Sequence, residues 1–310
     1  MDNLLHLSVS PHIHSGRSTS RIMGDVLLAL LPAAVAGTVI FGLRSLLVIA
    51  ITVASAVLFE FLFNLITKKA QTVGDLSAAV TGLLLALNLP AGIPLWQCVI
   101  GSAFAILLVK CIFGGIGCNL VNPAITARVF MLVSFGSMTV QSFPTVVDTV
   151  AGATPLVQIA EGNAPNLTDL LLGTTGGAIG ETCAVALLAG LVYLLARRVI
   201  TWHIPVSFVG SVFLLSFLME GFDPMKALAL TLSGGLLLGA IFMATDYVTS
   251  PSTSAGKLIF GLGAGLLTFL IRYFGIYPEG VSFAILLMNI LNPYIEKWTA
   301  RRIFGGGNKA

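Results

Sequence analysis

Residues 44–66 read RSLLVIAITVASAVLFEFLFNLI, and no charged side chain lies between Arg44 and Glu60. An α-helix needs about 20 predominantly apolar residues to cross the hydrocarbon core of a bilayer. This stretch is long enough, and similar apolar segments recur along the chain. The ten segments are 25–42, 44–66, 74–89, 94–113, 122–138, 180–197, 204–220, 226–244, 257–275 and 282–297. The sequence therefore predicts an all-α polytopic membrane protein with about ten transmembrane helices.

Composition supports this class and excludes others. Of the 310 residues, 56% are hydrophobic and only 9% are charged, whereas a soluble domain carries about 25% charged residues. A soluble enzyme, a disordered chain and a disulfide-stapled secreted domain are excluded. A net charge of +3 without a basic stripe also argues against a nucleic-acid partner.

Cysteine spacing predicts no metal site in this chain. Cys98, Cys111, Cys118 and Cys183 form no C-x-x-C pair, and three of them lie in or beside apolar segments. We expect them to be small buried residues. An iron site shared with another subunit is the alternative.

The distribution of lysine and arginine predicts the orientation in the membrane. If the N-terminus is cytoplasmic and the segments alternate, only Arg44, Lys226 and Arg272 fall outside. The residues placed inside are Arg17, Arg21, Lys68, Lys69, Lys110, Arg197, Arg198, Lys257, Lys297, Arg301, Arg302 and Lys309. Both termini are then cytoplasmic, and the longest loop is extracytoplasmic.

A weak internal repeat predicts two halves of opposite orientation. Gly82-Leu-Leu-Leu-Ala-Leu87 is similar to Gly235-Leu-Leu-Leu-Gly-Ala240, although chance similarity between apolar runs is an alternative. Two copies of five spans must be inverted because five is odd. The expected order is a cytoplasmic segment 1–24, a five-helix repeat 25–138, an extracytoplasmic loop 139–179, a second five-helix repeat 180–297 and a tail 298–310.

Polar side chains within apolar segments are costly and therefore candidates for function. Glu60 lies inside the second segment, Arg128 inside the fifth, and Asp246 at the end of the eighth. We name these three as candidates for an ion pathway. For Glu60 the alternative is a side chain that extends to the inner interface near Lys68. The polar stretch 243–250, which has no counterpart in the first repeat, is a candidate functional loop.

Two asparagines follow a glycine-rich turn in Gly114-Gly-Ile-Gly-Cys-Asn-Leu-Val-Asn-Pro123. Asn119 and Asn122 offer both donors and acceptors at the start of a helix, and could bind the edge of a planar heterocycle. Helix capping by Asn122 is an equally adequate explanation.

The long loop contains Asp148-Thr-Val-Ala-Gly-Ala-Thr-Pro-Leu156 and no lysine or arginine. From local chemistry alone this is a turn, with Gly152 giving backbone freedom and Pro155 following it. The hydroxyl of Thr154 is flanked by small residues, so a modifying enzyme can reach it.

The chain resembles a known family over nearly its whole length. It is similar to the D subunit of the Rnf complex, the ion-pumping ferredoxin:NAD oxidoreductase, and to the B subunit of the sodium-pumping NADH:quinone oxidoreductase. The matching stretches are Ser10–His12, Ser18–Met23, Asp75–Leu87, Gly117–Ala124, Phe242–Pro251 and Ile276–Val281. The length of the chain favours the Rnf subunit.

This resemblance implies a flavoprotein in the bacterial cytoplasmic membrane. In the family, a flavin transferase joins FMN through its phosphate to a Thr or Ser in a pattern that Asp148, Gly152, Ala153 and Thr154 match. Ala151 departs from the usual Ser or Thr. The resemblance further implies a non-covalent riboflavin near Asn119 and Asn122, and partners that include an FMN-bearing extracytoplasmic subunit.

The predicted function is thus a flavin-carrying electron-transfer subunit of an ion-translocating oxidoreductase complex, moving Na⁺ or H⁺. We expect no residue of this chain to catalyse bond chemistry itself, because the flavin performs the redox step. The alternatives are a transporter or channel built from inverted repeats, and a scaffold subunit without redox function.

Overall fold

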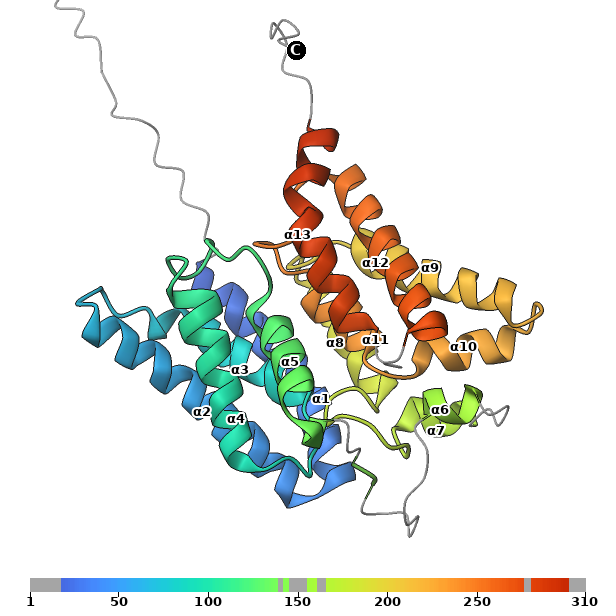
Figure 1. Cartoon of the computed structure of the whole chain (residues 1–310), viewed down its shortest axis with the longest axis horizontal. Coiled ribbons are helices and arrows are strands. Elements are labelled where there is room, and N and C mark those ends of the chain that lie inside the picture. The colour runs from blue at the N-terminus through green and yellow to red at the C-terminus, as the bar shows by residue number, and fades with distance from the viewer. Residues whose placement is uncertain (1–17, 139–141, 145–154, 161–165, 276–279, 301–310) are drawn as a thin grey trace, which may run out of the picture.

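The computed structural model of the chain describes residues 18–138, 142–144, 155–160, 166–275 and 280–300. Every multi-residue element in these ranges is a helix. A single antiparallel bridge joins Ser142 to Gly177. The prediction of an all-α protein is confirmed (Figure 1).

The first half of the chain forms a group of helices that pack closely on one another. Its main elements are α1 (Thr19–Phe41), α2 (Leu43–Ile66), η1 (Val73–Asp75), α3 (Ser77–Leu87), α4 (Leu95–Ala103), the π-helix η2 (Phe104–Cys111) and α5 (Pro123–Ser134). Helix α4 continues directly into η2. The short helix η3 (Gly136–Met138) follows α5.

The second half has a similar series of helices. They are α8 (Ala184–Ala196), α9 (His203–Met219), α10 (Pro224–Leu232), α11 (Leu236–Leu238), the π-helix η4 (Gly239–Met243), α12 (Ser254–Phe274) and α13 (Val281–Thr299). Between the halves, the predicted long loop carries two short helices, α6 (Pro155–Ala160) and α7 (Leu167–Leu172).

Each predicted apolar segment contains a helix, but most of these helices are shorter than a full span. Helices α1, α2 and α12 are long and apolar enough to cross a membrane, and α10 with α11 and η4 forms a fourth candidate that is bent by 65°. The predicted segment 74–89 is reduced to the 11 residues of α3. The structure of the described residues thus supports a polytopic membrane protein and leaves the number ten a prediction.

Local chemistry explains where these helices begin and end. Helix α3 stops before Asn88-Leu89-Pro90, because proline cannot continue a helix. Helix α10 ends before Gly234, whose φ of +68° suits glycine. Helix α1 begins at Thr19, earlier than the predicted 25, because the Ser18 side chain accepts a hydrogen bond from the backbone N–H of Arg21.

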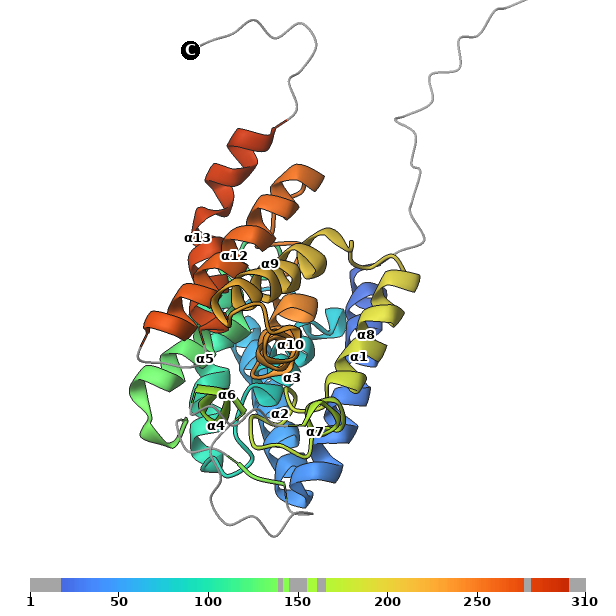
Figure 2. The same cartoon turned by 90° about the vertical axis from the view of Figure 1, so that its right-hand side faces the viewer.

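The two halves pack on each other through paired helices. Helix α1 packs against α8, and α5 packs against α13, while α9 packs against α12 within the second half. The main hydrophobic core runs through both halves and includes Leu30, Leu85, Leu187 and Phe260. Figures 1 and 2 show that α1 begins and α13 ends at one end of the molecule, whereas α6 and α7 lie at the opposite end.

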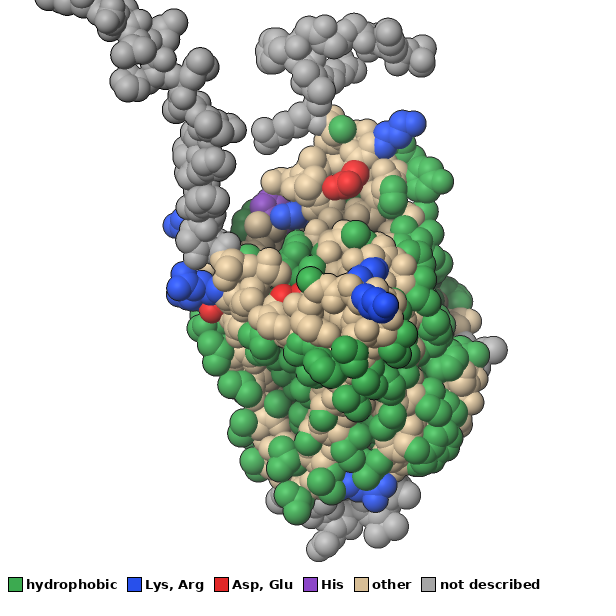
Figure 3. All heavy atoms as spheres, turned by 90° about the vertical axis from the view of Figure 1, so that its left-hand side faces the viewer, with side chains coloured by type: hydrophobic (Ala, Val, Ile, Leu, Met, Phe, Trp, Pro, Cys, Tyr) green, Lys and Arg blue, Asp and Glu red, His purple; other side chains and the backbone are tan. Residues whose placement is uncertain are grey.

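The outer surface is apolar, as expected for helices in lipid. Leu46, Leu58, Phe61 and Leu65 of α2 all expose more than two-fifths of their area. On the face seen in Figure 3, hydrophobic side chains cover the middle of the molecule, with lysine and arginine above and below them. A surface of this kind suits contact with lipid or with partner subunits.

Candidate functional site

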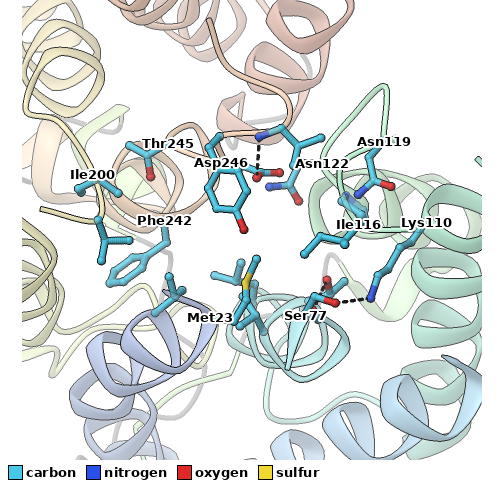
Figure 4. A pocket seen from close by; sticks show the side chains of 18 of the residues that line it. Met23, Ser77, Lys110, Ile116, Asn119, Asn122, Ile200, Phe242, Thr245 and Asp246 are labelled. Atoms are coloured by element: carbon cyan, nitrogen blue, oxygen red, sulfur yellow. Dashed lines mark hydrogen bonds between the residues drawn. The ribbon is translucent and has the colours of Figure 1, made fainter. Parts of the chain in front are cut away.

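A cavity lies between the two halves, and both contribute side chains to it (Figure 4). One side of the cavity is lined by α1, α3, η2 and the turn before α5. The other side is lined by the end of α8, by η4 and by the segment after η4. Met23 in the first turns of α1 belongs to the lining, so the cavity lies towards the end of the molecule where α1 begins.

The glycine-rich turn 114–117 carries Asn119 to the cavity. Gly114, Gly115 and Gly117 have φ of +120°, +97° and +89°, a conformation that other residues rarely adopt. The side-chain oxygen of Asn119 is buried and accepts no hydrogen bond within the described residues. Such an orphaned acceptor needs a partner, and a ligand in the cavity would provide one.

Asn122 lines the same side of the cavity but is largely occupied by structural bonds. Its Oδ1 accepts hydrogen bonds from the N–H groups of Ala124 at 3.0 Å and Ile125 at 3.4 Å, which caps α5. Its Nδ2 donates to the carbonyl of Met243 at 3.2 Å. Capping by Asn122 is confirmed, and the residue also ties the two halves together at the cavity.

Asp246 approaches the cavity from the second half, in the polar stretch singled out by the sequence. Its carboxylate accepts hydrogen bonds from the Val248 N–H at 3.2 Å and the Thr249 hydroxyl at 3.4 Å. Burial raises the pKa of this carboxyl. Burial, with the negative charges of Asp246 and Asp75, raises the pKa of the Tyr247 phenol to about 12.

Lys110 is a cavity residue that the sequence analysis placed on the cytoplasmic side of the membrane. In the structure Lys110 is in η2 and its side chain is only 2% exposed; its side of the membrane stays a prediction. The Nζ atom donates to Glu60 Oε1 at 2.7 Å and to Ser77 Oγ at 2.6 Å. Its position inside the apolar segment 94–113 was the signal that could have identified it.

Glu60 lies behind Lys110 and does not line the cavity. Its side chain is 2% exposed and is paired with Lys110. The alternative in which Glu60 extends to the interface near Lys68 is therefore wrong: the low-dielectric interior favours a buried partner.

Arg128 lies apart from the cavity, between α5 and the second half. Its Nη1 donates to Asn88 Oδ1 at 2.9 Å and to Ser282 Oγ at 3.0 Å, and Nη2 is 4.0 Å from Glu181 Oε2. The structure thus brings Asn119, Asn122 and Asp246 to one cavity, and Arg128 to a separate polar cluster.

The predicted flavin-acceptor residues Asp148, Gly152, Ala153 and Thr154 lie outside the described residues. The chain is described again from Pro155, the first residue of α6. Leu156 and Ile159 of α6 are buried in a small cluster with Leu170 and Leu230. The residues that directly follow Thr154 are therefore anchored to the body of the protein.

The cysteines do not form a cluster. Cys98 and Cys111 are buried as expected, but Cys118, which directly follows the glycine-rich turn, is exposed. Within the described ranges no three His, Cys, Asp or Glu side chains are arranged to hold a metal ion.

The arrangement suits a small, planar, hydrogen-bonding ligand. Apolar side chains such as Val80, Leu84 and Phe242 supply most of the lining, with few polar groups to orient a ligand. The fold and the cavity together define a helical membrane protein with a candidate ligand site at the interface of its two halves.

Comparison with known proteins shows the family: the chain belongs to the NQR2, RnfD, RnfE family, whose model matches residues 6–305. It is 46% identical over 307 residues to the D subunit of the Na⁺-translocating ferredoxin:NAD⁺ oxidoreductase complex of Acetobacterium woodii, covering 97% of this chain and 95% of that protein. It is 41% identical over 323 residues to the D subunit of the proton-translocating ferredoxin:NAD⁺ oxidoreductase complex of Clostridium ljungdahlii, covering 98% and 97%. The D subunit of the ion-translocating oxidoreductase complex of Escherichia coli K12 is 36% identical over 347 residues, covering 97% and 99%.

Proposed function

We propose that this chain is the flavin-carrying membrane subunit of an Rnf-type complex, which couples electron transfer from ferredoxin to NAD⁺ with the movement of an ion. The observation that carries the proposal is the match along almost the whole chain to relatives that are D subunits of such complexes. Its partners are the other Rnf subunits, including an extracytoplasmic subunit that bears FMN, and a flavin transferase. A bound flavin supplies one- and two-electron redox chemistry that side chains lack.

Thr154 is the proposed acceptor of covalent FMN, through a phosphoester to its hydroxyl. Asp148, Gly152 and Ala153 are the residues that the flavin transferase would recognise around it. Leu156, two residues further on, is buried against the body of the protein. A flavin attached there has a short tether to a fixed point, which limits the distances over which it moves.

The cavity is the proposed site of a non-covalent riboflavin. The orphaned Asn119 oxygen can accept a hydrogen bond from a ring N–H. Asn122 has one amide hydrogen left after its bond to Met243. Apolar side chains on both sides of the cavity suit the flat faces of an aromatic ring.

The proposed membrane topology has two inverted five-helix repeats, cytoplasmic termini and the flavin loop outside, in a bacterial cytoplasmic membrane. Two observations support it. The first helices of the halves, α1 and α8, pack together, and so do the last helices, α5 and α13, as a two-fold relation requires. The start of α1 and the end of α13 lie at the end of the molecule opposite α6 and α7 (Figure 1).

Glu60, Arg128 and Asp246 are the proposed residues of the ion pathway. Glu60 and Arg128 are buried. Arg128 and Asp246 lie where the two halves meet, which is where transporters built from inverted repeats place their sites. The ion is Na⁺ or H⁺, since one relative is named for sodium and another for protons at similar identity.

The first test is to produce the complex together with its flavin transferase and examine the subunits on a denaturing gel under ultraviolet light. We expect a fluorescent band near 32.4 kDa, and mass spectrometry of the peptide 148–156 should place FMN on Thr154. Thr154→Ala should abolish the fluorescence of this band and most of the ferredoxin:NAD⁺ activity.

Thr149→Ala is the matched control, because it removes a hydroxyl from the same loop but keeps Asp148 and Thr154. It should leave the band fluorescent. A dark wild-type band with an unmodified Thr154 peptide would favour a transporter or channel, and full activity in Thr154→Ala would favour a scaffold subunit.

A further inference from the structure

Lys110 stands between a buried carboxylate and the cavity. A lysine ammonium has three donors, and the described contacts use two of them, to Glu60 at 2.7 Å and to Ser77 at 2.6 Å. The side chain also lines the cavity itself, as Figure 4 shows. The third donor is therefore available to a ligand there.

Glu60 depends on Lys110 for its charge balance. Its Oε1 accepts bonds from Lys110 and from the Thr72 hydroxyl at 2.8 Å, whereas its Oε2 is buried without a hydrogen bond within the described residues. A buried carboxylate that loses its cation must acquire another, because an isolated buried charge costs several kcal/mol or more.

Glu60 is bonded to an exposed residue near the end of the molecule at which α2 terminates. Thr72, which binds Glu60, is exposed and also accepts a hydrogen bond from Asn64 at 2.9 Å. An exposed residue is thus in direct contact with the Glu60 carboxylate.

Other charged groups border this cluster. They are Asp75, which accepts a bond from Ser77, Lys69, which lies over the ring of Phe63, and Asp246 across the cavity. None of them has a hydrogen bond to Lys110 or Glu60 among the described contacts.

We propose that Lys110 is a charge-compensating switch: its ammonium turns from Glu60 towards the cavity when the ligand there gains an electron, and Glu60 then binds a cation from solvent. The proposal rests on the flavin assigned to the cavity above. Charge is conserved, since one electron enters from a redox partner in the complex and one Na⁺ or H⁺ enters at Glu60. Reoxidation returns Lys110 to Glu60 and displaces the cation.

The coupling between the charge of the ligand and cation binding at Glu60 acts over a short distance. Lys110 has four rotatable side-chain bonds, and its ammonium already touches both Glu60 and Ser77, so a change of rotamer suffices. The two states differ in which anion holds the lysine, which is a differential interaction of the kind that coupling requires.

The test is reduced-minus-oxidised infrared difference spectroscopy of the intact complex, reduced electrochemically in Na⁺ or in K⁺ buffer. We expect a carboxyl band that is lost in Glu60→Gln and also in Lys110→Met. A protonated-carboxyl C=O band identifies H⁺ as the cation; a carboxylate band that shifts between Na⁺ and K⁺ identifies Na⁺.

Two further variants are controls for a general loss of the fold. Lys110→Arg keeps the charge and should retain the Glu60 band, and Lys297→Met, which changes an exposed lysine of α13, should leave the spectrum unchanged. Identical wild-type and Glu60→Gln spectra, or a Glu60 band that persists in Lys110→Met, would overturn the switch.

Extraction of non-covalent flavin separates this inference from the proposed function. A complex in which this chain holds no extractable flavin refutes the cavity assignment itself. A complex that holds the flavin but shows no Glu60 band refutes only the role of Lys110 and Glu60.

Discussion

Arg128 of α5 donates a 3.0 Å hydrogen bond to the hydroxyl of Ser282 at the start of α13, 154 positions later in the chain. The same Nη1 donates to Asn88 Oδ1, just beyond the end of α3. One side chain therefore joins the break after α3 to both of the terminal helices of the halves. In a membrane interior, such polar contacts hold elements together where apolar packing alone is not selective.

Removal of this guanidinium should destabilise the protein strongly. In Arg128→Met, Asn88 and Ser282 lose a donor and Glu181, 4.0 Å away, loses a nearby cation. Loss of one partner of a buried charged cluster costs about 3–5 kcal/mol. Thermal unfolding in detergent should show a clearly lower midpoint.

Arg128→Lys is the matched control, because it keeps the charge but not the fork of donors. It should fall between the wild type and Arg128→Met. An unchanged midpoint in Arg128→Met would contradict a structural role.

Two substitutions of Asn122 should separate its two roles, which are the cap of α5 and the hydrogen bond to Met243. Asn122→Ser keeps an uncharged side-chain oxygen at the cap of α5 but loses the amide donor to the Met243 carbonyl, whereas Asn122→Ala removes both. The loss of the cap costs about 0.5–2 kcal/mol. We expect unfolding midpoints in the order wild type, Asn122→Ser, Asn122→Ala.

Equal midpoints for the two variants would show that the cap contributes nothing measurable. Non-covalent flavin content, measured in the same samples, should fall in both, because the bond to Met243 closes the cavity between the halves.

Helices α9 and α12 should tolerate no added volume where they touch. A Cβ on Gly261 would overlap the hydroxyl of Ser207, and a Cβ on Gly265 would overlap that of Ser211. Close contacts of this kind depend on small residues four positions apart. Gly261→Val should therefore lower the unfolding midpoint and the yield of folded protein in detergent.

Gly210 is the matched control on the same pair of helices. No heavy atom lies within 4 Å of its added Cβ, and alanine is favoured over glycine in a helix by about 1 kcal/mol. Gly210→Ala should be neutral or slightly stabilising. A loss in Gly210→Ala as large as that in Gly261→Val would refute the packing argument.

Asp246 should make stability fall as the pH rises. Burial raises its pKa in the folded protein above the ordinary value of about 3.9. Above about pH 3.9 the unfolded chain releases this proton while the folded protein keeps it, so the folded state binds more protons and loses stability with increasing pH. The loss stops once the folded protein also ionises.

Asp246→Asn cannot titrate and still offers an oxygen to the Val248 N–H. Its unfolding midpoint should decline less than that of the wild type from about pH 4 up to the pH at which the wild-type curve levels. Parallel curves for the two proteins would show that Asp246 does not contribute to the pH dependence.

Much of this architecture follows from residues close together in the sequence. The apolar runs, Pro90, the Asn122-Pro123 pair and the glycines at 114–117 specify helices, breaks and turns through local sterics and hydrogen bonds. The family could also be inferred from the sequence, because its motifs are continuous stretches such as Gly117–Ala124. The lengths of the helices were harder to predict, since α3 and α5 are shorter than their apolar runs. Packing against neighbouring helices, as well as the local pattern, decides where a helix ends.

The sequence by itself determined the class of protein and the helical segments, since each depends on local composition. Only the tertiary structure decided which polar side chains meet. Glu60 and Lys110 are 50 positions apart, as are Gly92 and Ser142, which also share a hydrogen bond. A buried charge takes the partner that the packing of distant helices brings within about 3 Å, and no pattern along the chain specifies that distance.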